Sequence, residues 1–376
     1  MIKSTKEIGP IFLGLVVLLT SCKEFKTSKE QQSMIAEEAE PLAGTFTNPL
    51  LDSGADPWTI YHQGNYYYIK SGDRAITLMR TPDITDLRNA EQKVIWRAPD
   101  SGDHSKNIWA PEIHYINDNW YIYVAADDGD NRNHRMFVLE NTERNPFEGT
   151  FRMKSKLKTD AGDNWAIDGS IFRHRKQFYF IWSGWEQPKL EGGEETQNIY
   201  IAKMSNPWTV SSDRVLLSTP EFDWERNWSY PGVWRPDAPV YVNEGPQTLP
   251  HGDKLHIVYS ASGCWTPYYA LGLLTMNMDS DPMNKNSWTK AKEPLFRQSE
   301  ENRVFGTGHS SFFKSPDGTE DWILYHANDT PTDGCGGKRS PRAQRISWTA
   351  NDMPVLGEPY PTSRRLRKPS GTKVQN

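Results

Sequence analysis

Cysteine is scarce in this chain of 376 residues, which contains only three. None of the three belongs to a Cys-x-x-Cys pair or a Cys/His cluster, so a zinc site is improbable. The chain also lacks a basic block, and its net charge of −5 argues against nucleic acid as the main partner. Its N-terminal apolar run, residues 11–19, is too short to span a bilayer comfortably.

That short apolar run follows two lysines, which is the order typical of a signal peptide. The run ends in Leu-Thr-Ser-Cys, and this motif resembles the lipobox of bacterial lipoproteins, in which the cysteine becomes the first mature residue and carries the lipid. The resemblance implies a signal peptide over residues 1–21 and lipidation of Cys22. Residues 22–43 are rich in Lys, Glu, Ser and Gln, which predicts a flexible tether. We expect a protein of the cell envelope that meets the membrane only through its lipid, on the periplasmic face or at the cell surface.

The two remaining cysteines, Cys264 and Cys335, would then lie in an oxidising compartment, which permits a disulfide. The sequence alone does not give the distance between them, so their pairing stays open.

Aromatic residues make up 12% of the chain, with 15 tryptophans. Trp and Tyr have flat apolar faces and a polar edge, which suit the faces of sugar rings. A tryptophan-rich β core explains the same composition equally well.

A loose repeat runs through the rest of the chain. In each copy, a polar residue precedes a turn and a strongly aromatic strand; the five strands begin at Asn65, Asn119, Gln177, Lys254 and Asp321. The polar residues that precede these strands are Asp56, Glu112, Asp168, Glu244 and His309. Short β runs with Pro, Gly and Asn between them predict an all-β fold.

Five repeated units of this length predict a five-bladed β-propeller over residues 44–365, followed by a C-terminal tail over residues 366–376. A β-sandwich is the alternative, but it does not explain why a polar residue precedes each aromatic strand. The first strand of every propeller blade lines the central channel. The five polar residues are therefore expected to meet in one cavity.

Several carboxyl groups in one cavity cannot all titrate normally. Hydrolysis of a glycosidic bond needs one carboxylic acid that is protonated near neutral pH and another that is ionised to activate water. A further negative charge beside the acid would keep the proton on it.

The motifs around these residues resemble those of glycoside hydrolase family 43. Three acidic motifs carry the resemblance: Ala55-Asp56-Pro57-Trp58, Ala166-Ile167-Asp168-Gly169-Ser170 and Asn243-Glu244-Gly245-Pro246. Two supporting motifs are Trp109-Ala110-Pro111-Glu112 and Gly308-His309-Ser310-Ser311.

The resemblance implies a general base at Asp56, an orienting and pKa-modulating residue at Asp168, and a general acid at Glu244. It also implies inversion at the anomeric centre. Asp237 competes with Glu244, because the segment around residues 235–255 carries extra residues.

The same resemblance implies supporting roles for two more residues. Glu112 would bind substrate, or would hold the catalytic residues in place without contacting the substrate, rather than act as a catalyst. His309 would lie on the axis beside a bound cation, often calcium, or a water. A buried histidine satisfied by the backbone is the simpler alternative, and no cofactor is required for the chemistry.

Trp109, Trp165 and Trp182 are candidates for stacking on sugar rings, with packing between blades as the alternative for each.

The family resemblance also implies that one arginine of the fifth blade reaches the catalytic pocket. Arg342 is our choice, and Arg339 and Arg345 are alternatives.

Two further segments, Tyr259–Gly263 and Lys338–Gln344, resemble the arabinofuranosidase branch of the family. The predicted activity is therefore release of terminal α-L-arabinofuranosyl residues from arabinan- or arabinoxylan-type plant polysaccharides. A β-xylosidase and an endo-arabinanase are the alternative enzymes. A non-catalytic, glycan-binding surface lipoprotein is the alternative of another class, although a pure binder has no need for the acidic trio.

Overall fold

The computed structural model describes residues 44–72, 74–187 and 195–373. Cys22, the predicted signal peptide and the predicted tether lie outside these described residues. Within the described ranges, no helix is both long and apolar enough to cross a membrane.

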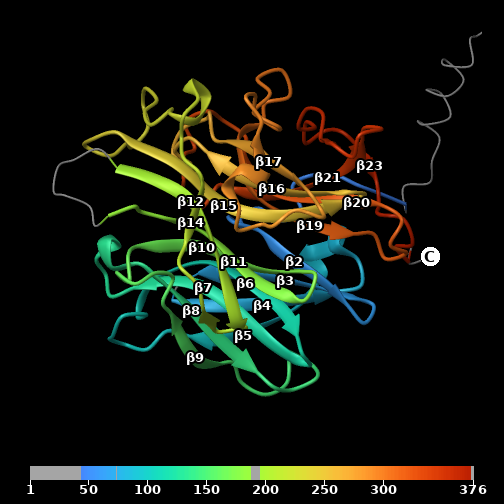
Figure 1. Ribbon diagram of the computed structural model, residues 1–376. Helices are drawn as coiled ribbons and strands as arrows, with labels where there is room; N and C mark the ends of the chain where they lie inside the picture. Colours follow the sequence, from blue (N-terminus) through green and yellow to red (C-terminus); the bar gives the residue numbers. More distant parts are fainter. Residues whose placement is uncertain (1–43, 73, 188–194, 374–376) are drawn as a thin grey trace, which may run out of the picture. The chain divides into compact units, whose positions relative to one another are not determined.

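Five antiparallel units follow one another along the chain, as the repeat predicts, and they form the five blades of a β-propeller (Figure 1). Blade I has β2 (Trp58–His62), β3 (Asn65–Gly72), β4 (Ala75–Thr81) and β5 (Glu91–Arg97). Blade II has β6 (Lys106–Ile116), β7 (Asn119–Asp127), β8 (Arg135–Asn141) and β9 (Arg152–Leu157). Blade III has β10 (Ala166–His174), β11 (Gln177–Gly184), β12 (Glu195–Asn206), β13 (Thr209–Val210) and β14 (Val215–Ser218). Blade IV has β15 (Val240–His251), β16 (Lys254–Ala261), β17 (Ala270–Asn277) and β18 (Thr289–Lys290). Blade V has β19 (Phe305–Lys314), β20 (Asp321–Asn328), β21 (Ser340–Trp348) and β22 (Pro354–Val355). Short 3-10 helices lie in the connections: η2 (Ile84–Asn89), η3 (Asn131–Asn133), η4 (Asp223–Glu225) and η5 (Lys285–Ser287).

The aromatic runs of the repeat are the second strands of the blades: β3, β7, β11, β16 and β20. These strands are buried on both faces; in β7, every residue after Asn119 is buried. Each blade is stacked between two neighbouring blades, so both faces of its middle strands are buried. The sequences of these strands are therefore continuous apolar runs.

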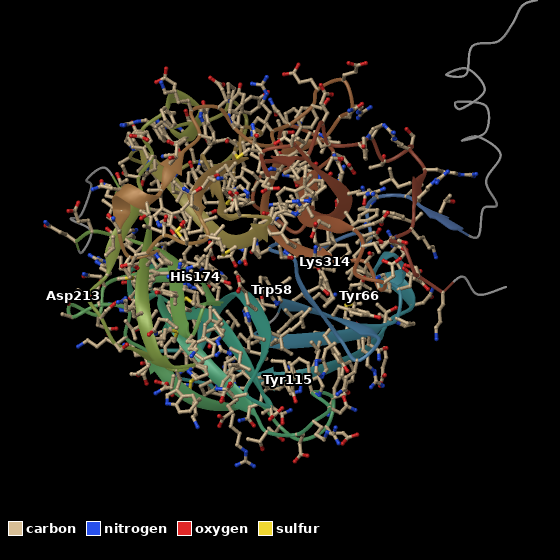
Figure 2. All side chains as sticks on the ribbon, turned by 45° about the vertical axis from the view of Figure 1, so that its right-hand side comes forward. Trp58, Tyr66, Tyr115, His174, Asp213 and Lys314 are labelled. Atoms are coloured by element: carbon tan, nitrogen blue, oxygen red, sulfur yellow. A yellow bond between two sulfur atoms is a disulfide. The ribbon has the colours of Figure 1, made fainter. Side chains whose placement is uncertain are left out.

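Five apolar clusters fill the spaces between neighbouring blades, and each draws its residues from two adjacent blades. Between blades I and II, for example, Ile69 packs in one cluster with Trp120. Trp58, near the middle of Figure 2, adds a hydrogen bond from its Nε1 to the backbone carbonyl of Ile113 in the next blade (2.8 Å). Each large apolar side chain buried in this way contributes about 1.5–3 kcal/mol, so the stacking of blades carries most of the stability.

Two strand pairs add connections beyond the individual blades. β12 pairs in parallel with β15, which links blades III and IV. β1 (Thr45–Phe46) pairs with β23 (Leu366–Arg367), and Phe46 and Leu366 join the cluster between blades V and I. The predicted boundary at residue 365 is therefore wrong. The segment that begins at Leu366 completes a core, because it brings an apolar side chain and a strand partner to the first described residues.

Candidate active site

The innermost strand of four blades is interrupted by a break in register, at Trp109/Glu112, Ile167/Ser170, Glu244/Gln247 and Gly308/Ser311. One residue within each break has a positive φ: Ala110 (41°), Asp168 (54°), Gly245 (56°) and His309 (44°). In blade I, Asp56 (53°) takes the same conformation just before β2. Such irregularities bend a strand and re-aim its side chains, here away from the interblade cores and toward the channel.

The breaks correct two details of the predicted repeat; the first is in blade II, where the positive-φ position is Ala110 and Glu112 lies two residues after it. Asp56, Asp168 and His309 occupy the equivalent position in their blades, where blade IV has Gly245. Glu244 therefore lies one residue before that position, next to Gly245, which adopts the positive φ without strain because it has no Cβ. A non-glycine residue with a positive φ costs about 1–3 kcal/mol, and such strain is typical of functional sites.

Asp56 is held by groups of blade V. Its Oδ1 accepts a hydrogen bond from Nη1 of Arg339 (3.0 Å) and lies 3.2 Å from Nδ1 of His309. Its backbone N–H donates to Nδ1 of His326 (3.1 Å), a fully buried ring. Burial, the largest influence, raises the pKa of Asp56. The charge and hydrogen bond of Arg339, with the two imidazoles, outweigh burial and lower that pKa to about 2.

The arginine at the site is thus Arg339, and the choice of Arg342 is wrong on this point. Arg342 is completely buried and pairs with Asp329 (2.6 Å). It lies opposite Tyr325, whose ring packs in the core between blades IV and V. Arg345, the third candidate, is 62% exposed and pairs with Glu320. Side chains alternate along β21, so Arg342 and Arg345 point to different faces of the sheet, and Arg339 lies in the loop before this strand.

Glu244 is held within its own blade. Its Oε1 accepts a hydrogen bond from the hydroxyl of Tyr269 (2.7 Å). Burial is the main cause that raises the pKa of Glu244 to about 7; the Tyr269 hydrogen bond opposes this and the charge of Asp56 adds to it. Asp237, the competitor in the sequence, is exposed in the segment before β15. Gly308 leaves room for the Tyr269 ring, because a Cβ there would lie 2.2 Å from Cε1 of that ring.

Asp168 is buried beside Glu244. Its Oδ2 accepts a hydrogen bond from the backbone N–H of Gly245 (3.1 Å) and lies 3.9 Å from Nδ1 of His309. Burial, with the charges of Glu244 and Asp56, raises the pKa of Asp168 well above its ordinary value. The two carboxyls behave as a pair that retains a proton into the neutral range. The Gly245 N–H favours the negative charge on Asp168 and so favours the proton on Glu244.

Glu112 and His309 are buried supports of this cavity. Nε2 of His114 lies 3.0 Å from Oε2 of Glu112, and Gln247 donates to Oε1, so both oxygens already have partners. The backbone N–H of His309 donates to Oγ of Ser260 (2.7 Å). Within the described ranges, no group of three or more His, Cys, Asp or Glu side chains is arranged to hold a metal ion. The surroundings of His309 therefore do not fit a calcium cage, which needs several oxygen ligands.

The three predicted tryptophans differ in exposure. Trp109 is 38% exposed and stacks on His134 (3.9 Å between centroids), so part of its ring is open to solvent and a sugar-stacking role stays a prediction. Trp182 is completely buried, and its stacking role is wrong: it packs against Tyr200 between blades II and III. Trp165 is 3% exposed and stacks on Trp185 (4.7 Å, 7°), so it too belongs to the core.

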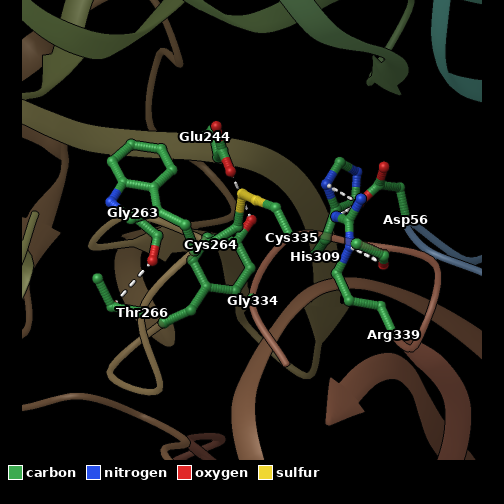
Figure 3. The surroundings of a disulfide bond; sticks show 12 residues. Asp56, Glu244, Gly263, Cys264, Thr266, His309, Gly334, Cys335 and Arg339 are labelled. Atoms are coloured by element: carbon green, nitrogen blue, oxygen red, sulfur yellow. Dashed lines mark hydrogen bonds and ion pairs between the residues drawn. A yellow bond between two sulfur atoms is a disulfide. The ribbon is translucent and has the colours of Figure 1, made fainter. Parts of the chain in front are cut away.

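Cys264 and Cys335 form a disulfide, with 5.3 Å between their Cα atoms. The bond joins the loop after β16 to the loop that carries Arg339, and Figure 3 shows it beside Glu244 and Arg339. A cross-link between residues 71 positions apart stabilises a fold by about 4 kcal/mol. The pairing agrees with an oxidising compartment.

Sequence reasoning missed Tyr269 and His326 completely. The two rings lie parallel, 5.6 Å apart. Because Tyr269 contacts Glu244 and His326 contacts Asp56, this stacking joins the surroundings of the two carboxyls. Each residue lies outside the five motifs, on a second strand or a connecting loop. The one sequence feature that relates to Tyr269 is Gly308, whose missing side chain leaves room for the Tyr269 ring. The two residues belong to different blades, so the sequence did not reveal this contact.

Comparison with known proteins agrees with this geometry. Residues 46–354 match the model of "Glycosyl hydrolases family 43". The chain is 34% identical over 294 residues to an extracellular exo-α-(1→5)-L-arabinofuranosidase of Streptomyces chartreusis, covering 77% of this chain and 84% of that protein. It is 33% identical over 338 residues to α-L-arabinofuranosidase 43 of Humicola insolens, covering 86% of this chain but only 66% of that longer protein. The crystal structure of an α-L-arabinofuranosidase from Lactobacillus brevis superposes with a TM-score of 0.76 at 32% identity, covering 85% and 98% of the two chains.

Proposed function

Because the chain belongs to glycosyl hydrolase family 43 and is a glycoside hydrolase, we propose that it releases terminal α-L-arabinofuranosyl residues from arabinan- or arabinoxylan-type plant polysaccharides. The observation that carries the proposal is that two neighbouring carboxyl groups have pKa values shifted in opposite directions. Asp56 is ionised down to about pH 2, and Glu244 stays protonated up to about pH 7. The arabinofuranoside specificity is supported by the names of the similar enzymes.

In the proposed reaction, Asp56 is the general base. Its carboxylate takes a proton from a water molecule, and the oxygen of that water attacks the anomeric carbon. Arg339 and His309 hold the carboxylate in place. The attack comes from the face opposite the leaving oxygen, so the configuration inverts; an inverting pair is typically roughly 6.5–9.5 Å apart to admit the water.

Glu244 is the general acid in the same step. As the bond between the anomeric carbon and the leaving oxygen breaks, Glu244 transfers its proton to that oxygen. Burial and the negative charge of Asp56 keep this proton on Glu244 until the bond breaks, and Asp168 orients the pair. Solvent then returns a proton to Glu244 and removes one from Asp56, and no step is assigned to a metal.

The experiment compares hydrolysis of 4-nitrophenyl α-L-arabinofuranoside with that of the β-D-xylopyranoside, and follows the product by proton NMR. We expect preference for the arabinofuranoside and a first-formed sugar of inverted configuration. Preference for the xyloside would make the protein a β-xylosidase. A retained configuration would contradict the role of Asp56, and failure to cleave any glycoside would favour the glycan-binding alternative.

The second part of the proposal is the organisation of the chain. It has a lipid anchor at Cys22, then a tether, then the catalytic domain. Two of the similar proteins are extracellular, which agrees with export of this chain. Labelled fatty acid should be incorporated into the wild type and not into Cys22→Ser; equal labelling of both would refute the anchor.

A further inference from the structure

A cavity of about 340 Å³ is lined by residues of blade IV and of the connections on either side of it, and none of the three catalytic carboxyls is among them. Its wall combines two aromatic side chains with four polar ones: Trp224, Tyr268, Asn227, Arg297, Gln298 and Glu300. None of these six residues takes part in the reaction proposed above. The volume is within the range of small-molecule binding sites.

The wall of the cavity is connected to the catalytic acid through the chain. Tyr268, in its wall, directly precedes Tyr269, whose hydroxyl donates to Glu244. Glu244 is the group that protonates the leaving oxygen, so the chain beyond the cleaved bond leaves the catalytic cavity on this side. An enzyme that removes terminal residues has the rest of the polymer there.

The lining has the chemistry that binds a neutral sugar. Tyr268 is 40% exposed and offers an apolar face, and the amide and charged groups supply both hydrogen-bond donors and acceptors for hydroxyls. Oε1 of Gln298 is buried and has no hydrogen-bond partner among the described residues. A buried acceptor without a partner is costly, and a ligand hydroxyl would satisfy it. Arg297 and Glu300 balance each other in charge, which favours a neutral ligand over an acidic one.

The wall is also held in place before any ligand arrives. Nε1 of Trp224 donates to a backbone carbonyl (2.8 Å), and the ring of Tyr230 meets Tyr268 edge-on at 5.7 Å. The backbone of Asn227 accepts from Gly263 (2.8 Å) and donates to Oγ of Ser262 (3.2 Å). These last two residues belong to the Tyr259–Gly263 segment, which thus has a role outside the catalytic cavity. Preorganisation of this kind lowers the cost of binding.

We propose that this cavity is a distal sugar-binding site, which holds one neutral sugar unit of the leaving-group chain during hydrolysis. The assignment of its occupant as part of a polysaccharide substrate rests on the function proposed above.

The test compares substrates that reach the distal site with one that does not. In Tyr268→Ala and in Arg297→Ala, kcat/KM on arabino-oligosaccharides and debranched arabinan should fall by about 5- to 10-fold. Hydrolysis of 4-nitrophenyl α-L-arabinofuranoside, which has no chain to place in the cavity, should stay within about twofold. Arg97→Ala, on the exposed outer strand of blade I, is the matched control and should change neither.

Equal losses on short and long substrates would overturn the proposal, and so would unchanged kinetics on the long ones. A binding measurement separates this result from failure of the proposed function. In a Glu244→Gln background, calorimetric titration with arabinan, arabinoxylan and polygalacturonate should show binding of a neutral glycan that Tyr268→Ala weakens. Binding that does not depend on Tyr268, a preference for polygalacturonate, or no binding would each overturn it, whether or not arabinofuranosides are cleaved.

Discussion

Blades I and IV each present one carboxyl group to the same cavity, and the two groups have shifted pKa values in opposite directions. Asp56 of blade I has a pKa lowered to about 2, and Glu244 of blade IV has one raised to about 7. Both are penalised by burial. The difference is that Asp56 faces a guanidinium and two imidazoles, whereas Glu244 faces a tyrosine hydroxyl and other carboxyls.

The groups that lower the pKa of Asp56 all come from blade V: Arg339, His309 and His326. Blade V therefore supplies no acid or base of its own but decides which carboxyl of the ring is ionised. Residue type alone does not assign the roles of two carboxyls in one cavity; their neighbours from other blades do.

The largest effect is expected from Asp56→Asn, which removes the ionised member of the pair. Because water activation fails whatever the leaving group, kcat/KM should fall by about 10²–10⁴-fold on aryl glycosides and on oligosaccharides alike. Circular dichroism is the control for folding. A loss confined to substrates with poor leaving groups would contradict the role of a base.

Glu244→Gln removes the protonated member of the pair. On oligosaccharides, whose leaving oxygen needs a proton, kcat/KM should fall by about 10²–10³-fold; on a dinitrophenyl arabinofuranoside the loss should be much smaller. The wild type should lose activity as the pH rises through about 7, since the acid must be protonated, and the variant should lack this basic limb. Normal turnover of oligosaccharides by the variant would refute the assignment.

Arg339→Met tests why Asp56 is ionised. Without the guanidinium, the pKa of Asp56 should rise, so the loss of activity on acidification should begin at a higher pH. The rate at neutral pH should fall by about tenfold, because the carboxylate also loses a charge-assisted hydrogen bond. Arg345→Met, at an exposed position of β21, the strand that follows the loop carrying Arg339, is the matched control. An unchanged acidic limb of the pH–rate profile in Arg339→Met would show that Arg339 does not lower the pKa of Asp56.

The smallest effect is expected from Tyr269→Phe. The hydroxyl donates to Glu244 and lowers its pKa, so its removal should raise that pKa and move the basic limb of the pH–rate profile above pH 7. The rate at the optimum should change by only a few fold. Tyr268→Phe keeps the ring of the neighbouring residue and removes a hydroxyl that does not contact Glu244, so it should leave the pH–rate profile in place. A shift of the basic limb to lower pH in Tyr269→Phe would show that the Tyr269 hydroxyl raises, and does not lower, the pKa of Glu244.

Much of the fold could be predicted from local pattern. Strands β3, β7, β11, β16 and β20 are recognisable because both of their faces are buried, which gives each one an aromatic or aliphatic run between turns. The role of Leu366 could not be predicted, because a two-residue strand carries no pattern of its own.

The sequence by itself determined the five blades, their order and the acidic residues of their inner strands, because alternation, turns and burial are properties of short segments. Tertiary structure decided which arginine reaches Asp56, which tyrosine holds Glu244 and which tryptophans are buried. Arg339 is 283 residues from Asp56, and the two meet only because the ring closes. A pKa depends on distance in space, and the closed ring sets those distances.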